Sequence, residues 1–173
     1  MDKRRIKEIL GELPFTAELY WQFVQRHKPW QAHFNLDLLV SELPKAVLQA
    51  ESYINSAMLG KNIFVFASLH YWIEYSMFLS LALAGKGHHV TFAFLPYASW
   101  DEPIQRFDLR RQNLYARQVL RPAGSMIGVQ SLLDVKPLST RLPLALRGAV
   151  EEVSTFDAQY SLQVEEITQA KAT

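Results

Sequence analysis

The stretch that most constrains the fold runs from Lys61 to Pro96. It begins with an apolar run, residues 62–67, that is short and rich in Ile, Val and Phe, as a buried strand is. A segment with apolar residues at helical spacing follows and stops at Gly85-Lys86-Gly87, where a glycine can close a helix. A second apolar run covers residues 90–95. This order predicts a βαβ unit with parallel strands and a right-handed crossover.

The predicted helix of this unit carries Ile73, Met77 and Leu81 on one face. We expect that face to pack on the sheet, because residues at this spacing share one side of a helix. Both strands, residues 62–67 and 90–95, are almost wholly apolar, which is typical of strands buried on both faces. We therefore place them side by side in the sheet centre.

The rest of the chain predicts mainly helices. Thr16 and Asn35 are the expected N-caps of two helices in the N-terminal third, where there is no strand signal. Periodicity and breakers predict helices over residues 5–13, 16–27, 36–54, 101–120, 141–153 and 157–170, and a third strand over residues 126–129. The expected fold is α/β, a Rossmann-like three-layer domain with a short parallel sheet and an N-terminal helical segment.

The length of 173 residues favours one domain, because it allows one sizeable core and is too short for two typical ones. Within it we distinguish a helical segment, residues 1–60, from a Rossmann-like α/β portion, residues 61–173. Three parallel strands make half of a doubly wound sheet. The chain is therefore interpreted as a fragment of a longer protein, or as one that completes its fold with another copy in a homo-oligomer.

Composition excludes several classes of function. A net charge of +1 argues against a nucleic-acid binder that relies on many phosphate contacts. The absence of cysteine removes disulfides and thiolate chemistry and fits a reducing compartment. No apolar stretch has the roughly 18 residues that a membrane span needs, and the charged N-terminus does not resemble a signal peptide. We expect a cytoplasmic protein.

The first candidate site is the loop after the first strand, because ligands of open α/β sheets sit at the carboxyl ends of the strands. Here Ser68, His70 and Tyr71 stand in place of a glycine-rich phosphate loop. His70 is a candidate general base, since an imidazole can take a proton from a hydroxyl near neutral pH. The alternative is that Ser68 caps the following helix and His70 only fills its first turn.

The second candidate is the acidic pair Asp101 and Glu102, which follows the second strand and should reach the same rim. A carboxylate there would orient the imidazole of His70; the alternative is plain helix capping. Neither a nucleophile elbow nor a DxD motif occurs in the sequence. The adjacent residues His88 and His89 should point to opposite faces of a strand, so we expect no metal and no cofactor.

Two further groups of side chains suggest binding. Arg106, Arg110, Arg117 and Arg121 fall within roughly 60° of one another on a helical wheel. They form either an anion-binding face or an ordinary solvated surface. The aromatic residues near the predicted rim would offer a platform for sugar stacking, or else belong to the core; they are Trp72, Tyr75, Tyr97 and Trp100.

At this point the residues indicate a family. The pattern FVFASLH, followed by a helix ending in LALAGKGHHVTFAFLP, resembles the first βαβ unit of GT-B glycosyltransferases over about a fifth of the chain. The matching positions are Leu81, Ala82, Gly87, His88, Val90 and Thr91. In some branches of that family a histidine just after the first strand is the base toward the acceptor hydroxyl, and His70 falls at that place. The chain departs from the family in lacking glycines after the first strand.

The resemblance implies the acceptor-binding half of a metal-independent glycosyltransferase. His70 would be the base, Asp101 or Glu102 its orienting partner, and the nucleotide sugar would be held by a second domain or subunit, because 173 residues cannot contain the donor domain. The alternative is a non-catalytic Rossmann-like module that binds a ligand or a protein through the same rim or through the arginines.

Overall fold

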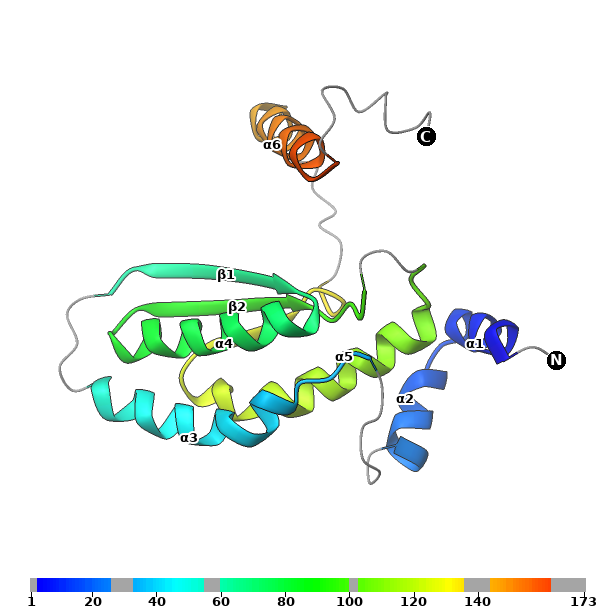
Figure 1. The fold of residues 1–173 in the computed structure, drawn as a ribbon, viewed down its shortest axis with the longest axis horizontal. Helices are drawn as coiled ribbons and strands as arrows, with labels where there is room; N and C mark the ends of the chain where they lie inside the picture. Colours follow the sequence, from blue (N-terminus) through cyan, green and yellow to red (C-terminus); the bar gives the residue numbers. More distant parts are fainter. Residues whose placement is uncertain (1–2, 26–32, 55–59, 100–102, 136–143, 163–173) are drawn as a thin grey trace. The chain divides into compact units, whose positions relative to one another are not determined.

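The computed structural model describes residues 3–25, 33–54, 60–99, 103–135 and 144–162. The chain divides into two units, Met1–Val135 and Lys136–Thr173. The second unit contains α6 (Leu144–Leu162). The elements of the first unit, in chain order, are α1 (Lys3–Glu12), α2 (Thr16–Tyr20), the π-helical turn η1 (Trp21–Gln25), α3 (Asp37–Tyr53), β1 (Asn62–Ser68), α4 (His70–Gly85), β2 (His89–Leu95), α5 (Arg106–Leu120), the 3-10 helix η3 (Arg121–Ser125) and β3 (Gly128–Ser131) (Figure 1).

The three described strands form one parallel sheet in the order β1-β2-β3. The register places Phe64 beside Thr91 and Thr91 beside Gly128. The α/β class and the pairing of the first two strands are thus confirmed. Their predicted position is wrong in part, because β2 is central and β1 lies at an edge of the described sheet. An apolar run shows that a strand packs on a core, but it does not distinguish an edge from a centre.

The core lies between the sheet and the helices on one of its faces. Helix α4 packs against β1 and β2, and α5 packs against β3. Ile73 and Met77 are fully buried and Leu81 is nearly so, as the helical spacing predicted. Helix α3 packs on α4 through a stripe of buried residues, namely Leu39, Leu43, Val47 and Ala50. The helices before residue 60 therefore belong to the same compact unit as the sheet.

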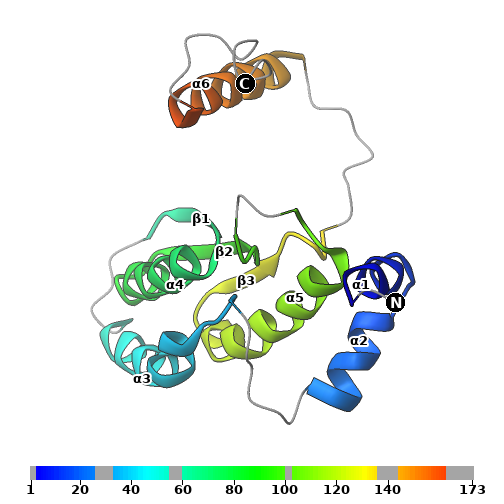
Figure 2. The ribbon, with the colours of Figure 1, turned by 45° about the vertical axis from the view of Figure 1, so that its right-hand side comes forward.

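The other face of the sheet is exposed over much of its area. Phe64 and Phe66 of β1 are 66% and 50% exposed, although both are large apolar side chains. Thr91 of β2 and Gln130 of β3 are exposed on the same face, which the register aligns across the sheet. In Figure 2 the helices α4 and α5 lie on the same side of the strands. Two consecutive crossovers of the same hand in one direction place both helices on one face of a parallel sheet.

Several predicted boundaries differ from the structure. The third strand covers Gly128–Ser131 rather than residues 126–129, because the chain is still turning at Met126, whose N–H bonds the carbonyl of Ala123. Thr16 is the first residue of α2 and not its N-cap; that position is held by Phe15. Leu36 rather than Asn35 is the N-cap of α3, with no side-chain cap. The hydroxyl of Thr16 donates instead to the carbonyl of Leu13 at 3.1 Å, and the N–H of Leu36 bonds the hydroxyl of Tyr115 at 3.3 Å.

The start of α5 and the predicted break within α6 also differ from the structure. Helix α5 begins at Arg106 and not near Asp101; Pro103 and Ile104 are not helical, and Gln105 is extended at the N-cap. The predicted break between residues 153 and 157 is absent, since α6 runs unbroken through it. Serine and threonine lower helix propensity only slightly, so they do not end a helix whose apolar pattern continues.

Among the described residues, no helix combines the length and the apolar character needed to cross a bilayer.

Candidate functional site

The carboxyl end of β1 is the place where the backbone departs most from ordinary geometry. Leu69, between Ser68 of β1 and His70 of α4, has φ 65° and ψ 147°. A non-glycine residue at positive φ costs about 1–3 kcal/mol and persists only where its surroundings hold it. The Leu69 side chain is 8% exposed, so burial supplies that constraint. The strain forces a sharp turn from the strand into the helix and puts His70 at the rim of the sheet.

His70 is the first residue of α4, directly after the end of β1, and its side chain is partly buried. Its ring meets that of Tyr71 edge to face, with centroids 5.2 Å apart. The Nδ1 atom is inaccessible to solvent and has no hydrogen-bond partner among the described residues. A buried polar atom without a partner is costly, and in native proteins it commonly marks a functional or ligand-bound position.

The N-terminus of α4 carries no side-chain cap. Ser68 lies within β1, in register with Leu95, and does not cap the helix. The first turn of a helix has N–H groups without intrahelical partners, and these together with the helix dipole attract negative charge. The rim beside His70 therefore has an uncapped helix end.

Of the other residues predicted at the rim, the structure describes Tyr97. Tyr97 follows β2, and its N–H donates to the carbonyl of Leu95 at 2.9 Å. Because the ends of β1 and β2 are in register, Ser68, His70 and the Tyr97 segment meet at one end of the sheet. Trp100, Asp101 and Glu102 lie outside the described residues, so the predicted pairing of His70 with a carboxylate stays a prediction.

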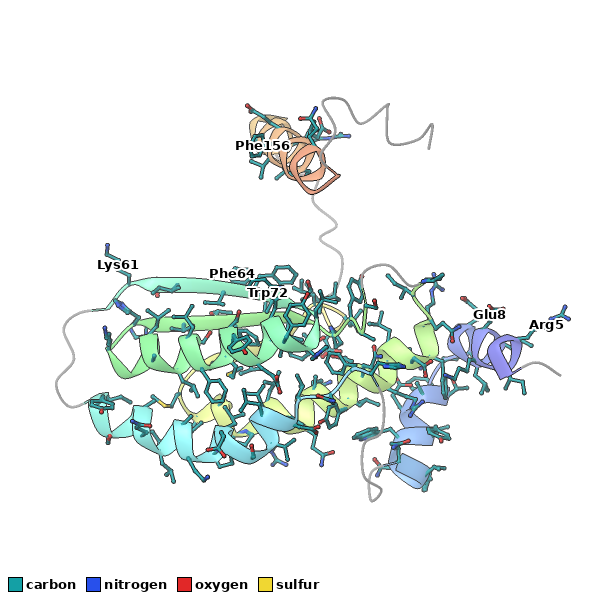
Figure 3. All side chains as sticks on the ribbon, viewed as in Figure 1. Arg5, Glu8, Lys61, Phe64, Trp72 and Phe156 are labelled. Atoms are coloured by element: carbon teal, nitrogen blue, oxygen red, sulfur yellow. The ribbon has the colours of Figure 1, made fainter. Side chains whose placement is uncertain are left out.

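Three aromatic residues of α4 are on the surface rather than in the core. Tyr71 is 40% exposed, Trp72 57% and Tyr75 67%, and Figure 3 labels Trp72 on this helix. All three belong to the first turns of α4, beside His70. They offer exposed aromatic surface near the start of α4.

Three of the four arginines of the predicted group, all on α5, pair with carboxylates. Arg106 pairs with Glu12 of α1 at 2.9 Å, and Arg117 pairs with Asp134 at 3.2 Å. Two guanidinium nitrogens of Arg110 donate hydrogen bonds to the carboxylate of Glu18 of α2. Arg110 also donates to the carbonyl of Leu13 at 2.8 Å. These contacts bind α1 and α2 to α5, which favours a structural role for Arg106 and Arg110.

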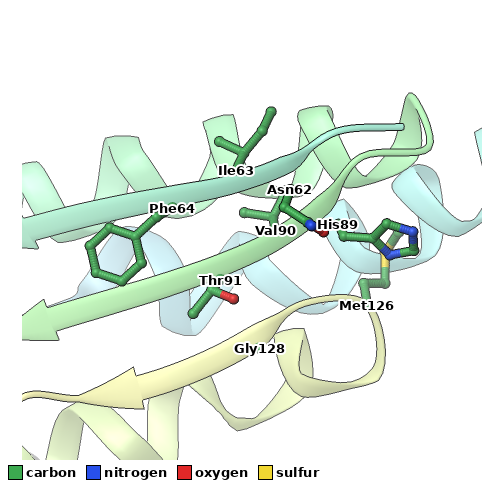
Figure 4. A pocket seen from close by; sticks show the side chains of 8 residues that line it. All are labelled: Asn62, Ile63, Phe64, His89, Val90, Thr91, Met126 and Gly128. Carbon is green, nitrogen blue, oxygen red and sulfur yellow. The ribbon is translucent and has the colours of Figure 1, made fainter. Parts of the chain in front are cut away.

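Sequence reasoning did not point to a hollow at the other end of the sheet. It has a volume of about 350 Å³ and lies at the amino ends of the strands (Figure 4). Its wall includes Asn62, His89 and Thr91, and Gly128 leaves space beside Thr91 because it has no side chain. The neighbouring His88 accepts the N–H of Lys61 at 3.1 Å, which is a structural role. Within the described part of the chain, no group of three His, Asp or Glu side chains could hold a metal.

The fold and the rim define a mixed α/β protein with a short parallel sheet and an uncapped helix end beside a histidine. Comparison with protein-family models, with curated proteins and with solved structures finds no match for this chain.

Proposed function

We propose that the chain is the acceptor-binding half of a metal-independent, GT-B-like glycosyltransferase, with His70 as the general base. The observation that carries the proposal is the position of this residue. His70 stands directly after the first strand, beside an uncapped helix N-terminus, and its Nδ1 atom has no hydrogen-bond partner among the described residues. A base of this kind must stand where the acceptor hydroxyl can reach a ring nitrogen; because Nδ1 is inaccessible to solvent, this nitrogen is Nε2 in the proposal.

The proposed step is a simple displacement. A ring nitrogen of His70 takes the proton of the acceptor hydroxyl as its oxygen forms a bond to the anomeric carbon of the donor sugar. The bond from that carbon to the diphosphate breaks, and the nucleoside diphosphate leaves with the electron pair. Asp101 or Glu102 would stabilise the protonated imidazole. The exposed ring of Tyr71, with Tyr97 and Trp100, would bind the acceptor by stacking.

The donor nucleotide sugar belongs to a second domain or subunit in this proposal. The Rossmann-like three-layer arrangement is part of it as well, since one helical layer covers one face of the described sheet and a further layer would cover the face that carries Phe64 and Phe66. The cytoplasm is the proposed location, because a chain without cysteine suits a reducing compartment.

A titration followed by NMR tests the acceptor site. Simple sugars and glycans are added to the protein labelled on histidine, and resonances of His70 should shift while those of His89, at the opposite end of β2, stay in place. His70→Ala should abolish transfer in the complete enzyme and leave the melting temperature nearly unchanged, and His89→Ala serves as the matched control. A His70→Ala variant that loses stability without a specific loss of transfer would make His70 a packing residue and defeat the proposal.

A non-catalytic binding module is the second candidate function. It is favoured by the apolar sheet face around Phe64 and Phe66, which suits a protein partner. Unchanged partner binding in His70→Ala, together with its loss on replacing Phe64, would support this second function over the first.

A further inference from the structure

The free edge of β1 offers a regular row of backbone hydrogen-bonding groups. The carbonyl of Lys61 accepts the N–H of His89, 3.0 Å away, and Asn62 is in register with His89. In a parallel ladder with this register, the N–H and C=O groups of the odd-numbered residues of β1 bond to β2. The N–H and C=O groups of the even-numbered residues point away from β2, toward the edge of the sheet, where the described residues include no further strand. These residues are Asn62, Phe64, Phe66 and Ser68.

This edge has none of the features that normally prevent pairing. Edge strands are usually protected by charged side chains, by proline or by bulges. From Asn62 to Ser68, β1 has the sequence NIFVFAS, with no charged residue and no proline, and its register with β2 is continuous. Another uncharged strand would therefore meet no charge, proline or bulge in β1 itself.

The sequence of β1 is self-complementary about Val65. Turning the strand end for end about this residue places Phe64 opposite Phe66, Ile63 opposite Ala67 and Asn62 opposite Ser68. Aromatic residues thus meet aromatic residues, and the polar residues meet at the ends. A twofold axis requires this match, because the same surface must serve both partners. We infer that two copies of the chain pair through antiparallel β1 strands, forming one continuous six-stranded sheet centred on Val65.

Backbone geometry agrees with this register. Phe64 and Phe66 point their N–H and C=O groups toward the free edge, so they form hydrogen-bonded pairs with Phe66 and Phe64 of the second copy. The residues at the axis, Val65 and its equivalent, form a non-hydrogen-bonded pair, as their own groups are bound to β2. All four phenylalanines lie on the same face, and cross-strand aromatic pairs are among the favourable ones.

Helix α4 extends the interface beyond the strand. Glu74 accepts the N–H of Leu38 at 3.0 Å, which places α3 on the Glu74 side of α4. At 100° per residue, Trp72 and Leu79 lie about 160° and about 140° from Glu74. Helix α3 also packs against α5 and η3, so the side of α4 that contacts α3 is the side toward β3. The opposite side, which is under the β1 edge, carries Trp72 and Leu79, 57% and 55% exposed.

This second contact matters for the size of the interface. Stable interfaces bury about 1,200–2,000 Å² in total, more than one seven-residue strand edge provides. Two α4 helices brought together beneath the paired strands add the side chains of Trp72 and Leu79 from each copy. A large aromatic side chain alone contributes roughly 150–250 Å² when fully covered. The strand and the helix therefore complete one apolar, uncharged and self-complementary surface.

The first experiment uses charges to test the register. Phe64→Lys combined with Phe66→Lys places like charges opposite one another in both cross-strand pairs, and Phe64→Lys combined with Phe66→Glu places opposite charges there. Both double variants lose the same aromatic contacts. Sedimentation equilibrium should show a dimer for the natural chain, dimerisation weakened about tenfold or more by the first pair, and tighter association of the second pair than of the first.

A control for net charge is available on α3. Val40→Lys combined with Leu48→Lys adds the same charge at two exposed positions, 56% and 68%, and should leave the dimer intact. Phe64 and Phe66 are half or more exposed, so their replacement should spare the fold, which circular dichroism checks. A natural chain that stays monomeric, or equal association of the two double variants, would overturn the inference.

The second experiment exploits the absence of cysteine. Val65→Cys places two thiols at the twofold axis, where Cα atoms of a non-hydrogen-bonded pair are about 4.5 Å apart, within the range for a disulfide. Ile63→Cys, on the same strand and face, would place its thiols about 14 Å apart. Mild oxidation should cross-link the first variant and not the second. Equal cross-linking, or none with Val65→Cys, would count against this register.

Discussion

The hydroxyl of Tyr115 on α5 accepts a hydrogen bond of 3.3 Å from the backbone N–H of Leu36, the N-cap residue of α3. Both residues are buried. Because no side chain caps α3, this contact across 79 positions of sequence joins the start of one helix to the middle of another. It explains how the N-terminal helices become part of the same core as the sheet.

Tyr115→Phe tests this contact directly. The substitution removes only the hydroxyl oxygen and leaves the N–H of Leu36 buried without that acceptor. We expect a loss of about 1–3 kcal/mol in the free energy of unfolding, measured by urea denaturation. Tyr75→Phe, which alters a tyrosine that is 67% exposed, is the control and should change little. Equal stability of both variants would mean that the Leu36 contact contributes nothing.

Alkaline pH should weaken the fold through the same residue. Burial raises the pKa of Tyr115 above its ordinary value of 10.0, although the hydrogen bond from Leu36 lowers it in part. Below that value the phenol is neutral in both states, and above it the unfolded chain ionises first. Stability should therefore fall as the pH rises from about 9 to about 11. Unfolding curves at each pH should show a smaller decline in Tyr115→Phe, because lysines and exposed tyrosines contribute equally to both proteins.

Met77→Ala should be among the most damaging core substitutions. Met77 is fully buried between the sheet and α3, and its removal leaves a cavity as well as lost apolar burial. We expect a cost of about 2–5 kcal/mol. Leu48→Ala, at a position of α3 that is 68% exposed, is the matched control, and calorimetry or denaturant unfolding of both variants measures the difference. A cost below that of Leu48→Ala would contradict the described core.

The contact between Arg110 and Glu18 should stabilise the packing of α2 on α5. A double-mutant cycle with Arg110→Ala and Glu18→Ala should give a coupling energy of about 0.5–1 kcal/mol, because the pair is partly exposed and screened. The coupling should shrink in 1 M salt. Arg121→Ala, at an exposed position of the same arginine group, should show no measurable coupling energy with Glu18→Ala. A coupling of zero at low salt would leave Arg110 without the structural role assigned to it.

Phe15→Gly should stabilise the chain. Phe15 has φ 61° in the left-handed region and is 70% exposed, so a glycine relieves strain and sacrifices little burial. The expected gain is about 1 kcal/mol. Phe15→Ala keeps the Cβ atom and should give no such gain; thermal unfolding of the two variants separates relief of strain from the loss of the ring. A destabilised Phe15→Gly would show that the ring is needed for packing.

Much of the fold was predictable because it depends on local pattern. The apolar runs of β1 and β2 and the spacing of Ile73, Met77 and Leu81 indicate a βαβ unit before any contact is known. The position of His70 at the rim followed from the same unit, since the residue after a strand must emerge at its carboxyl end. These features depend on short-range sequence, in which side-chain periodicity and backbone geometry are directly linked.

What the sequence determined by itself was the α/β class, the parallel βαβ unit and the burial of one face of α4, because hydrophobic periodicity selects the element and its inner face. Only the tertiary structure decided that β1 lies at the edge of the described sheet, that Arg110 binds Glu18, and that Leu69 is held at positive φ. Each of these depends on which distant segment arrives as a neighbour. An edge strand differs from a central strand only in lacking a neighbour on one side, which its own sequence does not show. A charged residue occupies the same positions along a helix whether it faces water or a carboxylate.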